Sequence, residues 1–317
     1  ISSGFNLTYF RALTAAPASA ADWTSYVLDN HVRIKSLREQ DGRLVLGGFN
    51  YNDTGIPEAL RLWYANVPNP LGPEDWMPTD IGVTQYNSSN SLWPGLTIGP
   101  AGPWVALCDE TGKVRVGRAT TAWPTGPADW VFCDTPLVDV RYHVTEIVIS
   151  DGRSLVAAGS TGALGLSMMH ATTPQPALST DWVTHTVPAF QFAQGPGTMI
   201  MHNGTPLILS RRGTGPLEFD LTSTTQPASY TDWWSFNVSG TDCLAITANA
   251  EGLPFAVTSI RSQQKFLMRG LVPTPHFQKD VDWMELPVRD GPSLVILADG
   301  RVMAFGGGKV ALADSVW

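Results

Sequence analysis

The stretch ATTPQPALSTDW, residues 171–182, decides the fold, because its Asp-Trp ending recurs along the whole chain. The dipeptide occurs six times, and successive tryptophans lie 53, 54, 52, 51 and 50 residues apart. A similar connector of small residues, usually rich in proline, precedes each copy. One structural unit is therefore repeated about every 50 residues. The copies are Asp22-Trp23, Asp75-Trp76, Asp129-Trp130, Asp181-Trp182, Asp232-Trp233 and Asp282-Trp283.

Each period contains four short apolar runs, which we interpret as β-strands. One run begins at the tryptophan itself, and the others are illustrated by residues 143–150, 154–160 and 164–170. Tight-turn signals such as Asp151-Gly152 separate the runs, and this dipeptide favours a two-residue hairpin turn because both central residues need positive φ. Helical periodicity does not extend beyond a turn or two. The pattern predicts an all-β chain of antiparallel strands.

Units of about 50 residues with four strands are typical of β-propeller blades. We therefore expect a six-bladed propeller in a single domain over residues 1–317. Its repeats would run over about 23–75, 76–129, 130–181, 182–232, 233–282 and 283–317, the last completed by 1–22. The N- and C-terminal strands should close the ring. Two segments, 6–17 and 309–317, compete for the closing fourth strand, and the sequence leaves that choice open.

Length and composition narrow the class of protein. At 317 residues the chain would accommodate two domains, but six repeats leave no room for a second one. Only 15% of residues are charged, which fits blades packed on both faces. The net charge of −8 argues against nucleic acid as a partner. No run of 18 apolar residues exists, so insertion into a membrane as an apolar helix is not expected.

Two interpretations of the Asp-Trp pairs remain open. In the structural one, the tryptophan packs between blades and the aspartate accepts backbone N–H bonds that fix a turn. In the functional one, the six pairs Asp22/Trp23, Asp75/Trp76, Asp129/Trp130, Asp181/Trp182, Asp232/Trp233 and Asp282/Trp283 form equivalent pockets. Each tryptophan would then stack on a sugar and each aspartate would bind hydroxyl groups, with avidity gained from repetition.

The connectors at 119–130 and 171–182 resemble tandem repeats of bacterial and phage surface proteins with sialidase-like (BNR-type) propellers. The resemblance covers essentially the whole chain. It implies a six-bladed ring without catalysis in an extracellular, secreted or virion-surface setting. The chain begins at Ile1 without an initiator methionine, so we expect a processed or trimmed product. Five Asn-x-Ser/Thr sequons fit secretion, at Asn6, Asn52, Asn87, Asn203 and Asn237.

The search for catalytic residues gives candidates rather than a motif. Asp-boxes of the form S-x-D-x-G-x-T-W are absent. The arginines do not recur at one place in the repeat. Those considered include Arg33, Arg61, Arg115, Arg141, Arg211, Arg212 and Arg261. A two-carboxylate glycosidase would draw its pair from different blades. We expect a polar ring around the axial channel, where such a pair would lie, formed by Asp80, Asp134, Thr186, Asn237 and Glu285.

Nothing in the sequence indicates a metal or a cofactor. The six histidines form no H-x-x-x-H or H-x-H pattern, and no phosphate-binding glycine loop or G-x-S-x-G motif occurs. Cys108, Cys133 and Cys243 are too few for a disulfide scaffold. They are expected to be buried free thiols, with one disulfide pair plus an odd thiol as the alternative.

The function that these patterns favour is a surface adhesion module that binds a glycan or a protein partner. Two alternatives come from other classes. One is a glycoside hydrolase or lyase on the same scaffold, and the other is a structural appendage or capsid-surface component that self-assembles. The fold does not choose among them, because propellers serve all three.

Overall fold

A computed structural model describes a large part of the chain. The described residues are 7–14, 20–30, 32–51, 57–84, 94–109, 111–138, 140, 145–159, 166–187, 193–202, 204–212, 217–238, 242–248, 254–260, 264–270, 283–288, 293–296, 302–306 and 309–312. Within these ranges the only helices are single 3-10 turns, and no helix is long and apolar enough to cross a membrane.

The strands form five four-stranded antiparallel sheets, one three-stranded sheet and one two-stranded sheet. The two-stranded sheet holds β1 (Leu7–Ala12) and β2 (Trp23–Asp29). The first two four-stranded sheets are β3 (Val32–Gln40), β4 (Arg43–Tyr51), β5 (Pro57–Ala65), β6 (Trp76–Thr84), and β7 (Gly95–Gly99), β8 (Gly102–Cys108), β9 (Val114–Ala119), β10 (Trp130–Asp134).

Three further four-stranded sheets follow in the same order, and the three-stranded sheet comes last. They comprise β11 (Thr145–Ser150), β12 (Arg153–Ala158), β13 (Leu166–Ala171), β14 (Trp182–Val187); β15 (Ala193–His202), β16 (Thr205–Arg212), β17 (Leu217–Thr222), β18 (Trp233–Val238); β19 (Asp242–Ala248), β20 (Pro254–Ile260), β21 (Gln264–Gly270), β22 (Trp283–Val288); and β23 (Ser293–Ile296), β24 (Val302–Gly306), β25 (Lys309–Leu312).

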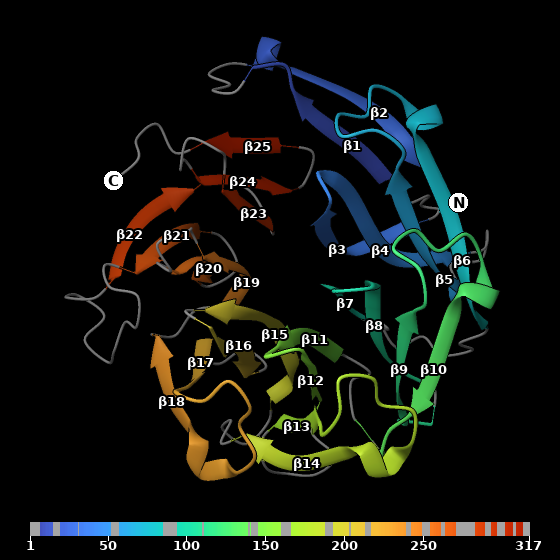
Figure 1. Ribbon diagram of the computed structural model, residues 1–317. Helices are drawn as coiled ribbons and strands as arrows, with labels where there is room; N and C mark the ends of the chain where they lie inside the picture. The colour runs from blue at the N-terminus through green and yellow to red at the C-terminus, as the bar shows by residue number, and fades with distance from the viewer. Residues whose placement is uncertain are drawn as a thin grey trace.

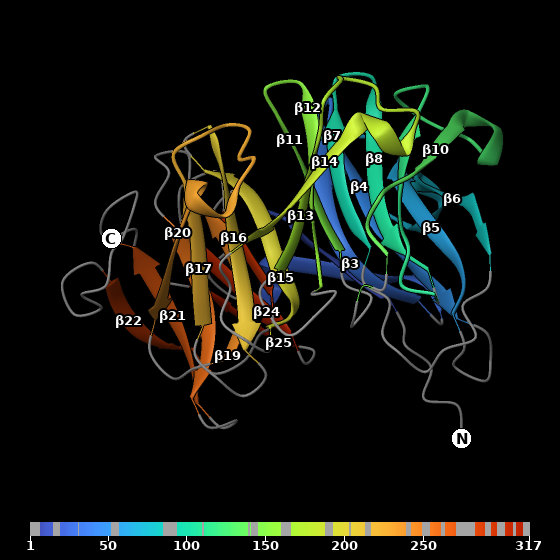
Figure 2. The same cartoon turned by 90° about the horizontal axis from the view of Figure 1, so that it is seen from below.

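The sheets follow one another around a common centre in chain order (Figure 1). Strands β3, β7, β11, β15, β19 and β23 lie innermost, where each contacts the next, and the strands that begin at a tryptophan lie outermost. Figure 2 shows the 3-10 turns before β10, β14 and β18 on one side of this arrangement. This is the all-β, propeller-like architecture that the repeat predicts.

The expected repeat boundaries are wrong by one strand. We expected a unit to begin with its tryptophan strand, but that strand closes a sheet begun after the previous tryptophan. Ala171 pairs with Trp182 and Ala119 pairs with Trp130, so the connector between them returns the chain antiparallel to itself. The connector therefore joins neighbouring strands within one sheet, and the chain passes to the next sheet after the tryptophan strand.

The two candidates for the closing strand lie in different sheets. Strand β1 pairs with β2, whereas β25 pairs with β24. Leu7, Tyr9 and Tyr26 of the two-stranded sheet pack against the sheet β3–β6, around Trp63 and Trp76. In the described residues, no hydrogen-bonded ladder joins β1 or β2 to β23–β25. The closed six-bladed ring thus stays a prediction.

Two hairpins between the first and second strands of a sheet have the turn type that their Asp-Gly dipeptides predict. Asp41 and Gly42 have φ of 49° and 75°, and Asp151 and Gly152 have φ of 50° and 71°. Both residues of each pair are thus left-handed, as a type I′ turn requires. These turns set the register of β3 on β4 and of β11 on β12, where Gln40 pairs with Arg43 and Ser150 with Arg153.

Candidate functional site

The carboxylate of the repeated aspartate folds back on the connector in Asp75, Asp129, Asp181 and Asp232. In four copies one carboxylate oxygen accepts the N–H of the residue four positions earlier. The bonds are Leu71 to Asp75 (2.7 Å), Thr125 to Asp129 (2.7 Å), Ala177 to Asp181 (2.9 Å) and Ala228 to Asp232 (2.7 Å). Backbone N–H bonds hold the pKa of Asp129, Asp181 and Asp232 below the usual range. These carboxylates act as turn caps.

The tryptophans of the same four copies are buried between sheets. Trp76, Trp130, Trp182 and Trp233 are only 5, 7, 5 and 4% exposed. Trp130, for example, packs with Leu62 of the sheet β3–β6 and Val105 of its own sheet. Trp23 is half-buried, and the side chain of Trp283 lies outside the described residues. A sugar cannot stack on indole rings covered in this way, so these four pairs do not form the equivalent pockets that we had considered.

A contact that the sequence analysis missed joins neighbouring sheets at two places. The indole N–H of Trp76 donates to the Tyr26 hydroxyl (2.8 Å), and that of Trp233 donates to His185 Nε2 (3.2 Å). Each acceptor stands three residues after the preceding repeat tryptophan. Cys133 has that place before Trp182, but its thiol donates to the backbone carbonyl of Asp134 (3.3 Å). The residue three positions after the repeat tryptophan is polar in four repeats. These residues are Tyr26, Thr79, Cys133 and His185, and their recurrence was the signal for this contact in the sequence.

His185 makes this contact sensitive to pH. Burial lowers its pKa to about 4, with a further lowering from His170 and an opposing effect of Asp232. Burial, with nearby Arg153, also lowers the pKa of His170. Between pH 6.5 and 4 the unfolded chain therefore binds protons that the folded chain does not, so stability falls as pH falls.

We expect the wild-type protein to lose about 1–2 kcal/mol more unfolding free energy than His185→Gln between pH 7 and pH 5. Glutamine keeps an acceptor for Trp233 but does not titrate. Urea unfolding at the two pH values measures the difference, and the carboxylates that titrate near pH 4 contribute equally to both proteins. Identical losses would contradict the assignment.

The expected axial ring is wrong, for the same reason as the repeat boundaries. Asp80, Asp134, Thr186, Asn237 and Glu285 all follow a repeat tryptophan and therefore lie on the outermost strands β6, β10, β14, β18 and β22. These strands lie at the periphery of the arrangement (Figure 1). Thr186 is exposed, and the side chains of Asn237 and Glu285 lie outside the described residues.

Asp80 and Asp134 instead form equivalent ion pairs across the two outer strands of neighbouring sheets. Arg61 Nε donates to Asp80 Oδ1 (2.7 Å), and Arg115 Nε donates to Asp134 Oδ1 (3.0 Å). The two arginines do recur at one place in the repeat, 19 residues before the aspartate in each case. Asp80 and Asp134 are 49 and 51% exposed as side chains, so both pairs are open to a ligand.

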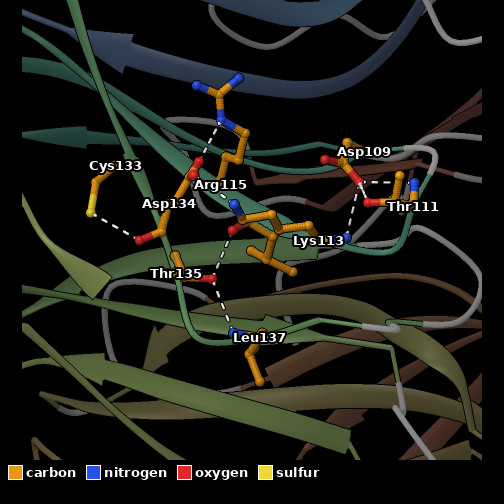
Figure 3. A network of polar contacts seen from close by, with 9 residues as sticks. Asp109, Thr111, Lys113, Arg115, Cys133, Asp134, Thr135 and Leu137 are labelled. Atoms are coloured by element: carbon orange, nitrogen blue, oxygen red, sulfur yellow. Dashed lines mark hydrogen bonds and ion pairs between the residues drawn. The ribbon is translucent and has the colours of Figure 1, made fainter. Parts of the chain in front are cut away.

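The pair on β9 and β10 is part of a larger polar cluster (Figure 3). Lys113 Nζ lies 2.6 Å from Asp134 Oδ2, and Arg115 lies over the Phe132 ring at 5.3 Å from its centroid. Lys113 and then Arg115 hold the pKa of Asp134 below its usual range. The cluster offers charged donors, a carboxylate and a half-buried ring in one place, which is what a polar ligand with an apolar face needs.

The innermost strands carry a second group of polar residues that the sequence analysis did not select. Glu146 on β11 is only 2% exposed, and Ser36 and Gln40 on β3 are also buried. Arg38 of β3 and Glu146 interact electrostatically: burial lowers the pKa of Arg38, and the Glu146 carboxylate opposes that change. No periodic signal marks Glu146, because the other innermost strands have no acid at this place.

The described cysteines are buried free thiols. Cys108 on β8 and Cys133 on β10 flank β9 in the sheet. Two strand spacings separate them by about 10 Å, which is beyond the reach of a disulfide. Burial raises the pKa of the Cys108 thiol to about 12. The side chain of Cys243 lies outside the described residues.

The part of the chain that the structure describes holds no cluster of three or more His, Cys, Asp or Glu side chains arranged to bind a metal ion. Four of the five sequons, at Asn6, Asn52, Asn87 and Asn203, fall outside the described residues, and Asn237 lies near the end of β18.

No protein-family model matches the chain, and no curated protein matches it. Solved structures do resemble it. A variant of Aleuria aurantia lectin in complex with Fucα1-6GlcNAc is 11% identical with a TM-score of 0.53, over 86% of this chain and 86% of the lectin. The Trypanosoma rangeli sialidase in complex with 2,3-difluorosialic acid is 10% identical with a TM-score of 0.52, over 98% of this chain and 58% of the sialidase.

An engineered GH43 glycoside hydrolase is also similar, at 11% identity and a TM-score of 0.44. The alignment covers 88% of this chain, which spans about half (51%) of that enzyme's length. At such identities the likeness concerns the fold, and it agrees with a propeller-like arrangement of four-stranded sheets.

Proposed function

We propose that this chain is a carbohydrate-binding β-propeller whose ligands contact the outer-strand pairs Arg61–Asp80 and Arg115–Asp134. The observation that carries the proposal is their repetition: two guanidinium–carboxylate pairs, each with a half-exposed carboxylate, occupy the same register in neighbouring sheets. Such pairs supply donors and acceptors for sugar hydroxyl groups. The lectin and sialidase neighbours are consistent with a glycan partner, and we propose an extracellular or virion-surface setting without catalysis.

The ring itself is part of this proposal. Strands β1 and β2 correspond to the outer two strands of a sheet, and β23 and β24 correspond to the inner two. We infer that together they make the sixth, closing blade, with β25 as the competitor for the edge of β24. A closed ring would hold the two ion-pair sites at a fixed spacing, so that one branched or repeated glycan engages both.

The experiment is a glycan array probed with the wild type, Asp80→Asn, Asp134→Asn and the double variant. We expect each single variant to bind at least about tenfold more weakly, since each loses the charge that orients its arginine. The double variant should bind nothing. Asp151→Asn is the matched control, because Asp151 lies in an exposed turn and asparagine tolerates its positive φ. An array without any wild-type binding, or variants that bind like the wild type, would refute the proposal.

A glycoside hydrolase is the second candidate, favoured by Glu146. This carboxylate is buried on an innermost strand, and it interacts electrostatically with Arg38. The described innermost strands carry two further acids, Glu39 and Asp242, as potential partners in the two-carboxylate mechanism. Hydrolysis of nitrophenyl glycosides or polysaccharides by the wild type, abolished in Glu146→Gln, would establish it. A wild type inactive on all of them removes this candidate.

A further inference from the structure

The two equivalent arginines differ in how completely their guanidinium groups are engaged. Arg61 donates from Nε and Nη2 to Asp80, at 2.7 and 3.3 Å, and its Nη1 lies 3.6 Å from Asp29 Oδ2. All three of its nitrogens therefore face carboxylates of the protein. Asp29 also accepts the Trp63 indole N–H (3.0 Å), which fixes it beside Arg61.

Among the described residues, Arg115 makes its hydrogen bond through one nitrogen. Its Nε donates to Asp134 Oδ1, while Asp134 Oδ2 receives Lys113 Nζ. The two terminal nitrogens of Arg115 have no hydrogen-bond partner among the described residues, and Figure 3 shows them pointing away from Asp134. The Arg115 side chain is 38% exposed. Because these nitrogens form a planar fork, they match the two oxygens of one incoming carboxylate.

The orientation of this fork is set in advance. The guanidinium carbon lies over the Phe132 ring, and the bond from Nε to Asp134 fixes its rotation. A ligand would therefore not have to order a free arginine side chain, and that ordering is a principal cost of binding.

The charges around the fork also favour an anion. Lys113 and Arg115 bring two positive charges to the single carboxylate of Asp134. The nearby Asp109 is turned to its own loop, where Oδ1 accepts the N–H groups of Thr111 (2.9 Å) and Lys113 (3.0 Å). At the neighbouring site the negative charges outnumber the positive one, since the carboxylates of Asp29 and Asp80 surround Arg61.

We propose that the Arg115 site recognises an acidic sugar, with the sugar carboxylate bound by both terminal nitrogens of Arg115 and assisted by Lys113. This specificity rests on the proposed carbohydrate-binding function and deepens it. The Arg61 site, whose fork is already occupied, accepts only neutral sugar groups. The chain therefore selects glycans that present a uronic acid or a similar carboxylate next to neutral residues.

The test compares methyl β-D-glucuronide with methyl β-D-glucoside, which differ in oxidation at C6. In titration calorimetry and saturation-transfer NMR we expect the full-length protein to bind the glucuronide at least about tenfold more tightly. Arg115→Lys keeps the charge but loses the fork, and should reduce that preference to about twofold. Arg118→Lys is the control, because Arg118 is stacked on Trp104 of the same sheet and faces no part of the cluster.

The outcomes separate this inference from the function on which it rests. Equal binding of the two glycosides, or a preference that survives Arg115→Lys, overturns the acidic specificity while leaving carbohydrate binding intact. Absence of binding to either glycoside and to the whole array overturns both. Sodium acetate supplies the carboxylate without the sugar, and competition by acetate as strong as by the glucuronide would show a general anion site and overturn sugar recognition.

Discussion

Replacing Trp233 by alanine is expected to lower the free energy of unfolding by about 3–5 kcal/mol, whereas the same change at Trp234 should cost less than about 1 kcal/mol. The two residues are neighbours on β18 but face opposite sides of the strand. Trp233 is 4% exposed and Trp234 is 57% exposed. Trp233 packs among Leu155, Met168 and Ile208 of two sheets, so its loss leaves a cavity between them.

Trp233→Ala also removes the indole donor of His185, which contributes to the expected loss. The measurement is urea unfolding followed by far-ultraviolet circular dichroism, because tryptophan fluorescence changes with either substitution. The pair is matched in residue type, strand and sequence position. Equal destabilisation by the two variants would contradict the role of the repeat tryptophan as the packing residue between sheets.

The regular spacing of the Asp-Trp copies predicts this packing role. The spacing does not show at which strand each sheet begins. Six Asp-Trp copies and the Asp-Gly turns predict four-stranded units correctly, since both depend on local backbone chemistry. The connectors are rich in small residues and proline, and the expected repeat bounds, which begin at each tryptophan, placed them at the ends of the units. The carboxylate of Asp181 instead binds the N–H groups of Ala177 and Leu178 and folds the connector into a turn. That contact is invisible in a linear pattern.

The one-strand error in the repeat boundaries also misplaced the predicted site residues. Asp80 and Asp134 were expected at the centre and lie at the periphery, yet they take part in the candidate site because Arg61 and Arg115 face them across a strand pair. The common separation of 19 residues was a signal that could have linked each acid to its arginine. Glu146 and Arg38 had no such signal, because they come from strands more than a hundred residues apart.

A close backbone approach between the innermost strands β7 and β11 gives the second large expected effect. A Cβ atom at Gly95 of β7 would lie 2.7 Å from the backbone nitrogen of Ile147 and 2.8 Å from the Cα and carbonyl carbon of Glu146. All three atoms belong to the main chain of β11, so no side-chain rotation relieves the overlap. We expect Gly95→Ala to lower the unfolding free energy by about 1–3 kcal/mol, because β7 and β11 must separate.

Gly126→Ala is the matched control for this change. A Cβ atom there has nothing within 4 Å, and the φ of −177° is extended backbone that alanine adopts readily. Ile147 shares a buried cluster with Trp182, so separation of the strands in Gly95→Ala should also shift tryptophan emission to the red. If Gly95→Ala unfolds at the same urea concentration as Gly126→Ala, then the innermost strands are not packed backbone to backbone. Glu146 would then lack the rigid neighbour that holds it at the centre.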